Sequence, residues 1–471
     1  MREGKKKRST FLNGILWSSK GIGTNVPNTL IVTYLSFYAT DVLGMKAALV
    51  ATILLLTKLF DGVTDLISGF IVDNTHTKFG KGRPYDICIA FIGVFTVLLF
   101  SAPKTGTLVQ VIWLSVMYIL LQAVFVTLLN TADSVYLLRA FPEERERNTT
   151  FSISTIFGQI ISITIGVILP VMIASAGTDH AEWTKVVLIV MVPCTIIGML
   201  RFFFVKEVNV EAPAVKKEQK QEIGQDRKTE KKKNADHVGL KDGARAIFEN
   251  KYILILALGI FIIVISSGLL NTSAAYYFQY IVGDMNKMAV ASLGTYASLV
   301  MLVIFVPLAN KFGKSNILKF GLVVAVIGNL IRWFGGTNIV TITAGMSMLM
   351  FGVMPLTLYF PLYLFDIMDY GEWKTGKRVE GLYAAFPTFA NKVASGLSVS
   401  LGMFVLGAAG YDGKAAVQTD AALNAINLSY NVLPTILLII MTLILIFLYN
   451  IDKKMPTVKK ELEERRAWKK K

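Results

Sequence analysis

The sequence predicts an all-α polytopic membrane protein with twelve transmembrane helices in two six-helix bundles. Hydrophobic residues make up 54% of the 471 residues and charged residues only 17%, whereas soluble domains carry about 25% charge. The mean hydropathy is +0.55. Apolar runs of the roughly 20 residues that cross a bilayer recur along the chain. One polar segment in the middle separates six of these runs from six more.

The same composition excludes other classes of protein. Disordered, collagen-like and coiled-coil chains have different compositions. The only cysteines, Cys88 and Cys194, lie in apolar runs and give no disulfide framework. The net charge of +16 would suit nucleic acid, but the lysines fall between apolar runs. We therefore expect no nucleic-acid partner and instead basic loops on the cytoplasmic face of a lipid bilayer.

The first span follows a basic start at residues 1–10, a pattern that imitates a signal peptide. The apolar run at 11–43 is too long for one, and no small-residue cleavage site precedes the next span, so we expect a transmembrane helix. Apolar runs place the twelve helices, in chain order, at 11–43, 47–73, 85–103, 107–137, 150–175, 184–204, 252–281, 289–310, 317–336, 339–364, 381–409 and 426–450.

The charge of the loops predicts the orientation. With both termini inside, the inside segments hold most of the basic residues. The outside connections then hold only Lys46, Lys104, Lys185, Lys287 and Lys414. Because cytoplasmic loops carry the excess of Lys and Arg, we expect a multi-pass protein of the cell (plasma) membrane with both termini cytoplasmic.

Residues 206–251 interrupt the series of spans. They are polar, show little apolar periodicity and contain the run Lys231-Lys232-Lys233. This composition is typical of a solvated tether, although its lysines can also contact anionic lipid. The expected organisation is an N-terminal six-helix bundle at 1–205, a cytoplasmic linker at 206–251, a C-terminal six-helix bundle at 252–450 and a basic cytoplasmic tail at 451–471.

A short repeat supports two related halves. Residues 77–81 (TKFGK) follow the second helix of the first half, and residues 310–314 (NKFGK) follow the second helix of the second half. Repeated halves are typical of secondary transporters. The upstream residues 69–73 (GFIVD) resemble the loop between helices 2 and 3 of the major facilitator superfamily, in which a helix-end aspartate meets basic residues.

Three ionisable residues lie inside the second predicted span. Lys58, Asp61 and Asp65 are spaced by three and four residues and therefore share one helical face. Each costs about 2.5–3.5 kcal/mol near mid-membrane, so each needs a partner, water or a ligand. Lys58 and Asp61 can neutralise one another, which leaves Asp65 unexplained. Paired carboxylates suit Na⁺, a hard cation, and equally a proton that two neighbouring carboxylates share.

Charged and polar residues also occur in the first and eleventh spans. Lys392 in the eleventh span needs a carboxylate or a ligand, and Asp61 or Asp65 is its natural partner. The first span holds Lys20 and Asn25, and Lys20 either faces the site or snorkels to the cytoplasmic surface.

The fourth span offers Thr127, Asn130 and Asp133, spaced by three and therefore on one face. Thr127 and Asn130 can supply neutral oxygens to a cation. Tyrosines can stack on a sugar, although most membrane aromatics are interface anchors or packing. The candidates are Tyr34, Tyr276, Tyr277, Tyr359 and Tyr383.

Motifs for other chemistry are missing from the sequence. His76, His180 and His237 are scattered and have no metal-binding spacing. There is no Walker A loop, which disfavours transport driven by ATP. There is no nucleophile elbow and no zinc-binding HExxH, so enzyme chemistry lacks support.

Three longer motifs carry a family resemblance. The first is residues 58–65 (KLFDGVTD) together with 80–85 (GKGRPY), the second is 144–148 (ERERN), and the third is 366–381 (DIMDYGEWKTGKRVEG). With these motifs the chain, from Trp17 to the twelfth span, resembles the glycoside–pentoside–hexuronide:cation symporter family. This family is the melibiose-carrier branch of the major facilitator superfamily.

The resemblance implies symport of a sugar or glycoside with Na⁺ or H⁺ by alternating access, at a mid-membrane site between the bundles. It implies that Asp61 and Asp65 bind the coupling ion, that Thr127 and Asn130 complete its site, and that Lys392 lies beside it. It also implies that the cytoplasmic loops at 73–84 and 366–380 form charge contacts that hold one state.

The expected substrate contacts depart from the melibiose carrier. Its helix 1 aspartate is matched by Asn25, its helix 4 aspartate by Asn130 and its helix 5 arginine by Thr155, while Lys58 stands in place of an arginine. We therefore expect a different glycoside, a pentoside or a hexuronide rather than a galactoside. The expected substrate-binding residues are Asn25, Asp133, Thr155, Thr388 and Asn391.

We expect a sugar symporter that is not an enzyme, works as a monomer and needs no cofactor beyond its coupling ion. The alternatives are a non-transporting sugar sensor on the same fold, a transporter of a non-sugar solute, and a channel. Asp61, Asp65 and Lys392 disfavour the sensor, and the half-repeated pattern disfavours the continuous polar pore of a channel.

Overall fold

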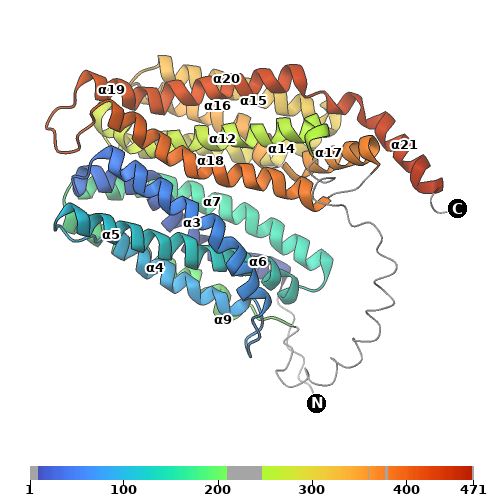
Figure 1. Ribbon diagram of the computed structural model, residues 1–471, viewed down its shortest axis with the longest axis horizontal. Coiled ribbons are helices and arrows are strands. Elements are labelled where there is room, and N and C mark those ends of the chain that lie inside the picture. The colour runs from blue at the N-terminus through green and yellow to red at the C-terminus, as the bar shows by residue number, and fades with distance from the viewer. Residues whose placement is uncertain (1–8, 209–244, 246, 359, 377–379, 469–471) are drawn as a thin grey trace. The chain divides into compact units, whose positions relative to one another are not determined.

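The computed structural model of the chain describes residues 9–208, 245, 247–358, 360–376 and 380–468. In these residues the regular secondary structure is helical, with no strand and one isolated bridge between Thr77 and Gly80. The chain divides into two compact units, Met1–Lys233 with Tyr411–Val417 and Asn234–Gly410 with Gln418–Lys471 (Figure 1). The prediction of an all-α protein is confirmed.

The helices of the first unit follow the expected spans closely. Several spans contain a π-helical stretch that continues the helix before it, as η1 continues α1. In chain order the elements are α1 (Thr10–Thr29), η1 (Leu30–Tyr34), α2 (Leu35–Phe37), η2 (Tyr38–Val42), α3 (Ala47–Asp73), η3 (Arg83–Ile87), α4 (Cys88–Leu99), α5 (Thr107–Tyr118), η4 (Ile119–Val126), α6 (Thr127–Ala140), α7 (Glu144–Ala176), α8 (His180–Gly198) and α9 (Leu200–Phe204).

The helices of the second unit also follow the expected spans, and one further helix, α21, comes at the end of the chain. In chain order the elements are α12 (Lys251–Tyr276), η5 (Tyr277–Ile281), α13 (Lys287–Ser292), η6 (Leu293–Tyr296), α14 (Ala297–Phe312), α15 (Lys314–Phe334), α16 (Ile339–Leu358), α17 (Phe360–Thr375), α18 (Glu380–Ala408), α19 (Asp420–Asn427), η7 (Leu428–Val432), α20 (Leu433–Leu448), η8 (Ile451–Lys453) and α21 (Met455–Trp468).

Nine of the described helices are long and apolar enough to cross a membrane. Helices also occupy the other three expected spans, at 10–42, 47–73 and 83–99. Two motifs that we expected in loops after transmembrane spans are helical in the structure. The motif at 144–148 forms the start of α7, and the motif that begins at Asp366 continues α17 as far as Thr375.

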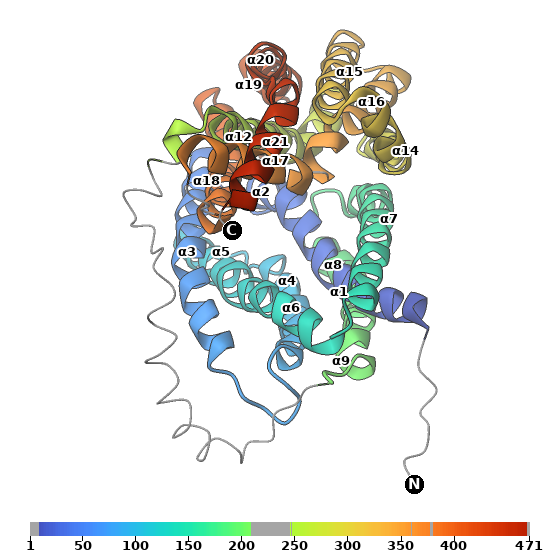
Figure 2. The same cartoon turned by 90° about the vertical axis from the view of Figure 1, so that its right-hand side faces the viewer.

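Small residues let helices approach closely, as in other membrane proteins. In the second unit α15 and α16 lie side by side (Figure 2), and a Cβ added at Gly352 would lie 2.1 Å from the carbonyl oxygen of Gly321. In the first unit a Cβ added at Gly198 would lie 2.9 Å from the Cα of Gly23. The contact between Gly198 and Gly23 brings the end of α8 onto α1 and places the short helix α9 next to α1.

The repeated loop has the same design in both units. Gly80 and Gly313 have φ values of +115° and +86°, a region that favours glycine. In the first unit Glu207, just after α9, accepts hydrogen bonds from the backbone N–H groups of Lys81 (3.0 Å), Gly82 (2.7 Å) and Arg83 (2.8 Å). In the second unit Asp452, just after α20, accepts one from the backbone N–H of Ser315 at 2.9 Å.

Charge contacts lie within each unit at the loops that we expected to be cytoplasmic. Lys81 Nζ lies 3.6 Å from Asp73 Oδ1 in the first unit. In the second unit Lys314 forms an ion pair with Asp366, and Lys459 of α21 lies 3.8 Å from the same carboxylate.

The C-terminal tail contains a docked helix, which the sequence did not lead us to expect. Met455, Val458 and Leu462 of α21 share a face and are buried. The indole N–H of Trp373 donates to Glu461 at 2.7 Å, and Arg465 donates to the carbonyl of Trp373 at 2.9 Å. These contacts hold α21 against α17.

Candidate functional site

A chain of four buried or partly buried charges runs through the first unit where α1, η3, α6 and α9 meet. At its centre Arg201 makes a two-point contact with Asp86, with Nε 2.9 Å from Oδ2, and a further ion pair with Asp133. The Arg201 and Asp86 side chains are 1% and 0% exposed. A two-point contact between arginine and a carboxylate fixes orientation as well as charge.

Aromatic rings enclose the same guanidinium. Its carbon lies 4.5 Å from the ring centroid of Trp17 and 5.0 Å from that of Tyr136, within the range of a cation–π interaction. Trp17 and Tyr136 belong to a small buried cluster with Phe141 and Val205. Arg201 is therefore both neutralised and packed.

Lys20 extends the charged chain toward the expected cation site. Its ammonium lies 3.2 Å from Asp133 Oδ1 and donates to Asn130 Oδ1 at 3.2 Å. The Lys20 side chain is only 13% exposed. Of the two alternatives for Lys20, snorkelling to the surface is wrong, because its ammonium is held by α6. The two cations and the two carboxylates of this chain balance in charge.

The two carboxylates expected to bind the coupling ion, Asp61 and Asp65, lie outside the described side chains, although the backbone of α3 is described. The Ser68 and Thr131 hydroxyls, 2.9 Å apart, join α3 to α6. One span returns the chain between these two helices, so they run in the same direction. Position 65 on α3 and Thr127 on α6 each lie about one turn before this contact.

The expected neutral ligands of α6 already have hydrogen-bond partners. Thr127 is buried, and its hydroxyl donates to the carbonyl of Gln122 at 3.1 Å. The amide oxygen of Asn130 accepts from Lys20. Lys58 of α3 lies over the Tyr118 ring, 5.8 Å from the centroid. In the described residues no group of three or more His, Cys, Asp or Glu side chains could hold a metal ion.

The expected substrate residues of the first unit lie on three helices. Asn25 on α1 donates to the Ser162 hydroxyl of α7 at 3.0 Å. Thr155 is partly exposed on α7, and its hydroxyl donates to the carbonyl of Phe151 at 2.9 Å. Asp133 on α6 is ion-paired to both Lys20 and Arg201, so it already has two cationic partners.

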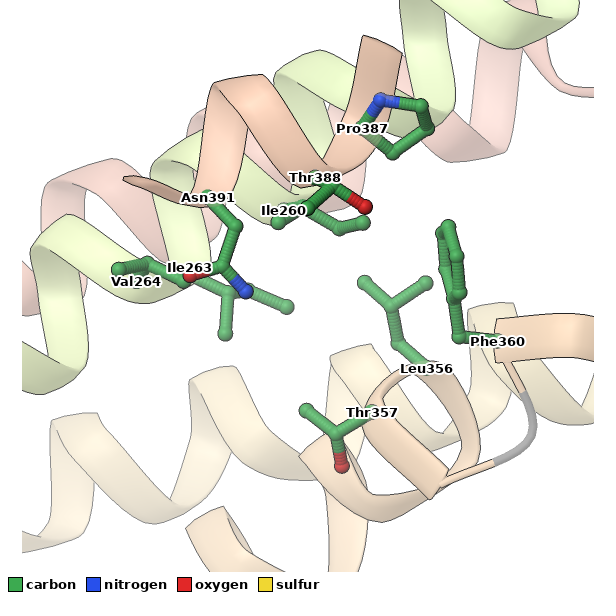
Figure 3. Close-up of a pocket in the computed structure, with 9 residues that line it drawn as sticks. All are labelled: Ile260, Ile263, Val264, Leu356, Thr357, Phe360, Pro387, Thr388 and Asn391. Atoms are coloured by element: carbon green, nitrogen blue, oxygen red, sulfur yellow. The ribbon is translucent and has the colours of Figure 1, made fainter. Parts of the chain in front are cut away.

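The expected substrate residues of the second unit line one pocket of about 280 Å³ (Figure 3). Thr388 and Asn391 lie one turn apart on α18, and Thr357 lies across from them on α16. The Phe360 ring lies beside Leu356 and below Pro387 in this view. Apolar side chains of α12 complete the wall, namely Ile260, Ile263 and Val264. Lys392 follows Asn391 on α18 and its side chain is exposed.

The tyrosines suggested as sugar platforms are mostly packing residues. Tyr34 meets Trp183 edge-on, Tyr277 stacks on Tyr430 at 4.2 Å, and the hydroxyl of Tyr383 accepts from Asn250 at 3.2 Å. These tyrosines and Tyr276 are at most 1% exposed. Tyr359 lies outside the described residues.

Sequence reasoning missed Arg201, Asp86 and Glu207. Arg201 is an ionisable residue inside the predicted span 184–204, and Asp86 lies inside the span 85–103. Their position within apolar runs was the available signal. Both are close to the end of a span, where a charge is usually solvated, so only the fold shows that they are buried together.

The helical fold, the repeated loop and the buried polar residues define a membrane transporter of the major facilitator type. Residues 16–453 match the family described as MFS/sugar transport protein, and the chain belongs to that family. It is a sugar transporter of the membrane and not an enzyme.

Curated relatives cover nearly the whole chain. It is 31% identical to the isoprimeverose transporter of Lactiplantibacillus pentosus, over 96% of this chain and 91% of that protein. It is 23% identical to the glucuronide carrier protein homolog of Escherichia coli (strain K12), over 96% of this chain and 95% of that protein.

Solved structures share the fold. The nucleoside transporter NupG superposes with a TM-score of 0.62 at 13% identity, covering 94% of this chain and 100% of that chain. The D-xylose-proton symporter superposes with a TM-score of 0.54 at 14% identity, covering 92% and 95%. The predicted major facilitator fold and symporter family are confirmed.

Proposed function

We propose that the chain imports a neutral glycoside across the cell membrane by symport with Na⁺ or H⁺, as a monomer with cytoplasmic termini. The observation that carries the substrate class is the pocket of the second unit. Its nine lining residues include three neutral polar side chains, Thr357, Thr388 and Asn391, and no charged one. Apolar walls with a few polar groups suit a sugar, which has both apolar faces and hydroxyl edges.

The departures from the melibiose carrier support the same class. Asn25 and Thr155 are neutral where that carrier has an aspartate and an arginine. A neutral amide can donate to and accept from hydroxyls, whereas recognition of a hexuronide carboxylate calls for a cation. The name of the isoprimeverose transporter also supports a glycoside as substrate.

The proposed cation site consists of Asp61, Asp65, Thr127 and Asn130. The contact between Ser68 and Thr131 supports it, because this contact brings the backbones of α3 and α6 together within one turn of residues 65 and 127. A cation at the two carboxylates would reduce their charge and so lower the cost of moving them during alternating access.

An uptake screen in proteoliposomes tests the proposal. Labelled neutral glycosides, pentoses and a hexuronide are offered under imposed Na⁺ or H⁺ gradients, with the external solution buffered to block the other ion. We expect saturable accumulation of a neutral glycoside that collapses with one of the two gradients. Accumulation of the hexuronide alone would overturn the substrate class, and uptake independent of both gradients would overturn symport.

Two matched variants on α18 locate the substrate. Asn391→Ala removes a polar group from the pocket, whereas Leu401→Ala shortens an exposed side chain of the same helix away from it. We expect Asn391→Ala to raise KM by roughly tenfold, the effect of losing one or two hydrogen bonds, and Leu401→Ala to leave KM unchanged.

A further inference from the structure

Lys20 holds the same oxygen that the proposed cation site needs. Its ammonium donates to Asn130 Oδ1 at 3.2 Å, and the amide oxygen of Asn130 is one of the neutral ligands in that site. Two cations cannot share one oxygen at contact distance without strong mutual repulsion. A coupling ion that uses Asn130 must therefore displace the ammonium of Lys20.

Lys20 keeps a second partner, which it already contacts, when it leaves Asn130. Asp133 Oδ1 lies 3.2 Å from the same nitrogen, and Asp133 is one turn further along α6. Arg201 shares Asp133 Oδ1 with Lys20, but Arg201 is also held by its two-point contact with Asp86. Asp133 therefore retains enough negative charge to hold Lys20 after Asn130 is released.

We propose that Lys20 is a specificity-determining residue for cation coupling. Its ammonium is a tethered cation that bonds to Asn130 and competes with the transported ion for the amide oxygen. This inference rests on the proposed function, in which Asn130 is a ligand of the coupling ion. Lys20 sets how much cation is needed for half-maximal uptake, and no bond to the sugar is required of it.

The competition makes a directional prediction. Lys20→Met removes the tethered cation and frees Asn130, so the concentration of Na⁺ for half-maximal uptake falls by roughly tenfold, a size common for coupling between two sites. If the driving ion is H⁺, the pH of half-maximal uptake rises by about one unit for the same reason. Lys20→Arg keeps a cation beside Asn130, so its Na⁺ concentration or pH of half-maximal uptake should lie closer to that of the original protein.

The experiment titrates NaCl against choline chloride, and pH in a parallel series, in proteoliposomes that hold the full chain. Because Lys20→Met leaves an extra carboxylate charge in the network, the charge-balanced variant Lys20→Met/Asp133→Asn is measured beside it. Lys185→Met is the matched control, since it removes a surface lysine of the same unit whose side chain is 63% exposed. The midpoint of thermal unfolding, with and without NaCl, reports ion binding without transport.

The results separate the two proposals. A lower cation requirement in both Lys20 variants, together with a thermal shift at lower NaCl or higher pH, supports the inference. An unchanged or higher requirement in both variants, with an original protein that does respond to Na⁺ or H⁺, overturns the inference alone. If uptake by the original protein responds to neither ion, the proposed symport itself fails.

Discussion

Arg201 and Asp86 form a bidentate ion pair that ties α9 to η3, with both side chains at most 1% exposed. Removing one partner of such a pair strands the other charge in a medium of low dielectric constant, at a cost of about 3–5 kcal/mol. We therefore expect Arg201→Gln to lower the free energy of unfolding by about this amount. Thermal unfolding of the purified protein measures it.

Two further variants interpret that result. Arg245→Gln removes an arginine that is 77% exposed and forms an ion pair with Glu249, four residues further along the chain, so it should be nearly neutral. Arg201→Gln/Asp86→Asn removes both charges and should recover part of the loss. If Arg201→Gln is as stable as Arg245→Gln, the buried network does not hold the first unit together.

Glu207 closes the loop between α3 and η3. Its carboxylate accepts from three backbone N–H groups and lies 3.1 Å from Arg139. Glu207→Ala leaves these donors without a partner, which should destabilise the protein by about 3 kcal/mol. Glu249→Ala is the control, because the Glu249 side chain is 39% exposed and forms an ion pair with Arg245, four residues earlier in the chain. Equal melting temperatures of the two variants would contradict this role.

The sequence was sufficient for the class of fold but not for the buried network. Hydropathy placed the expected spans close to the helices of the described residues, because a helix that can cross a bilayer is one long apolar run. The repeat at 77–81 and 310–314 marked equivalent loops that have the same design in the structure. Arg201 and Asp86 are more than a hundred residues apart in the sequence. No periodicity relates them, since their contact depends on how α9 packs against η3.

The sequence analysis also missed the helical structure of two charged segments. Residues 366–375 and 455–468 are rich in charge and were expected in a loop and a tail, yet both are helical. Both segments have narrow apolar faces that local sequence does not reveal. Their helices are stabilised by packing against each other, for example through the hydrogen bond between Trp373 of α17 and Glu461 of α21. Conversely, Thr388 and Asn391 were expected at the substrate, and the structure places both at one pocket.

Lys392 and Asp61 provide a test of charge coupling in the mechanism. Each is an ionisable group in an apolar span, and we predict that they neutralise one another. Because the Lys392 side chain is exposed, Lys392→Ala should cost less stability than breaking a fully buried pair, and its main effect should be on substrate exchange. Lys392→Ala with Asp61→Ala should recover part of the loss of folding or of substrate exchange. Strictly additive losses in the double-mutant cycle would count against a contact.

The linker at 206–251 offers a test away from the site. Deletion of Lys231, Lys232 and Lys233 should leave substrate affinity within a few-fold, because shortening a long tether costs little free energy. These lysines lie outside the described residues. Matched liposomes with and without anionic lipid measure binding and uptake. Loss of substrate binding by a folded, inserted protein would give this segment a role in transport.

Gradient-driven uptake by Asp65→Asn tests the central claim most directly. The variant lacks a carboxylate that must accept Na⁺ or H⁺, while Asp284→Asn removes an acid from a connection outside the spans. Both are compared with the original protein in proteoliposomes, for accumulation against a gradient and for exchange of labelled substrate. The account predicts that Asp65→Asn loses accumulation and keeps exchange, and that Asp284→Asn keeps both. Full accumulation by Asp65→Asn would contradict the assignment of the cation site.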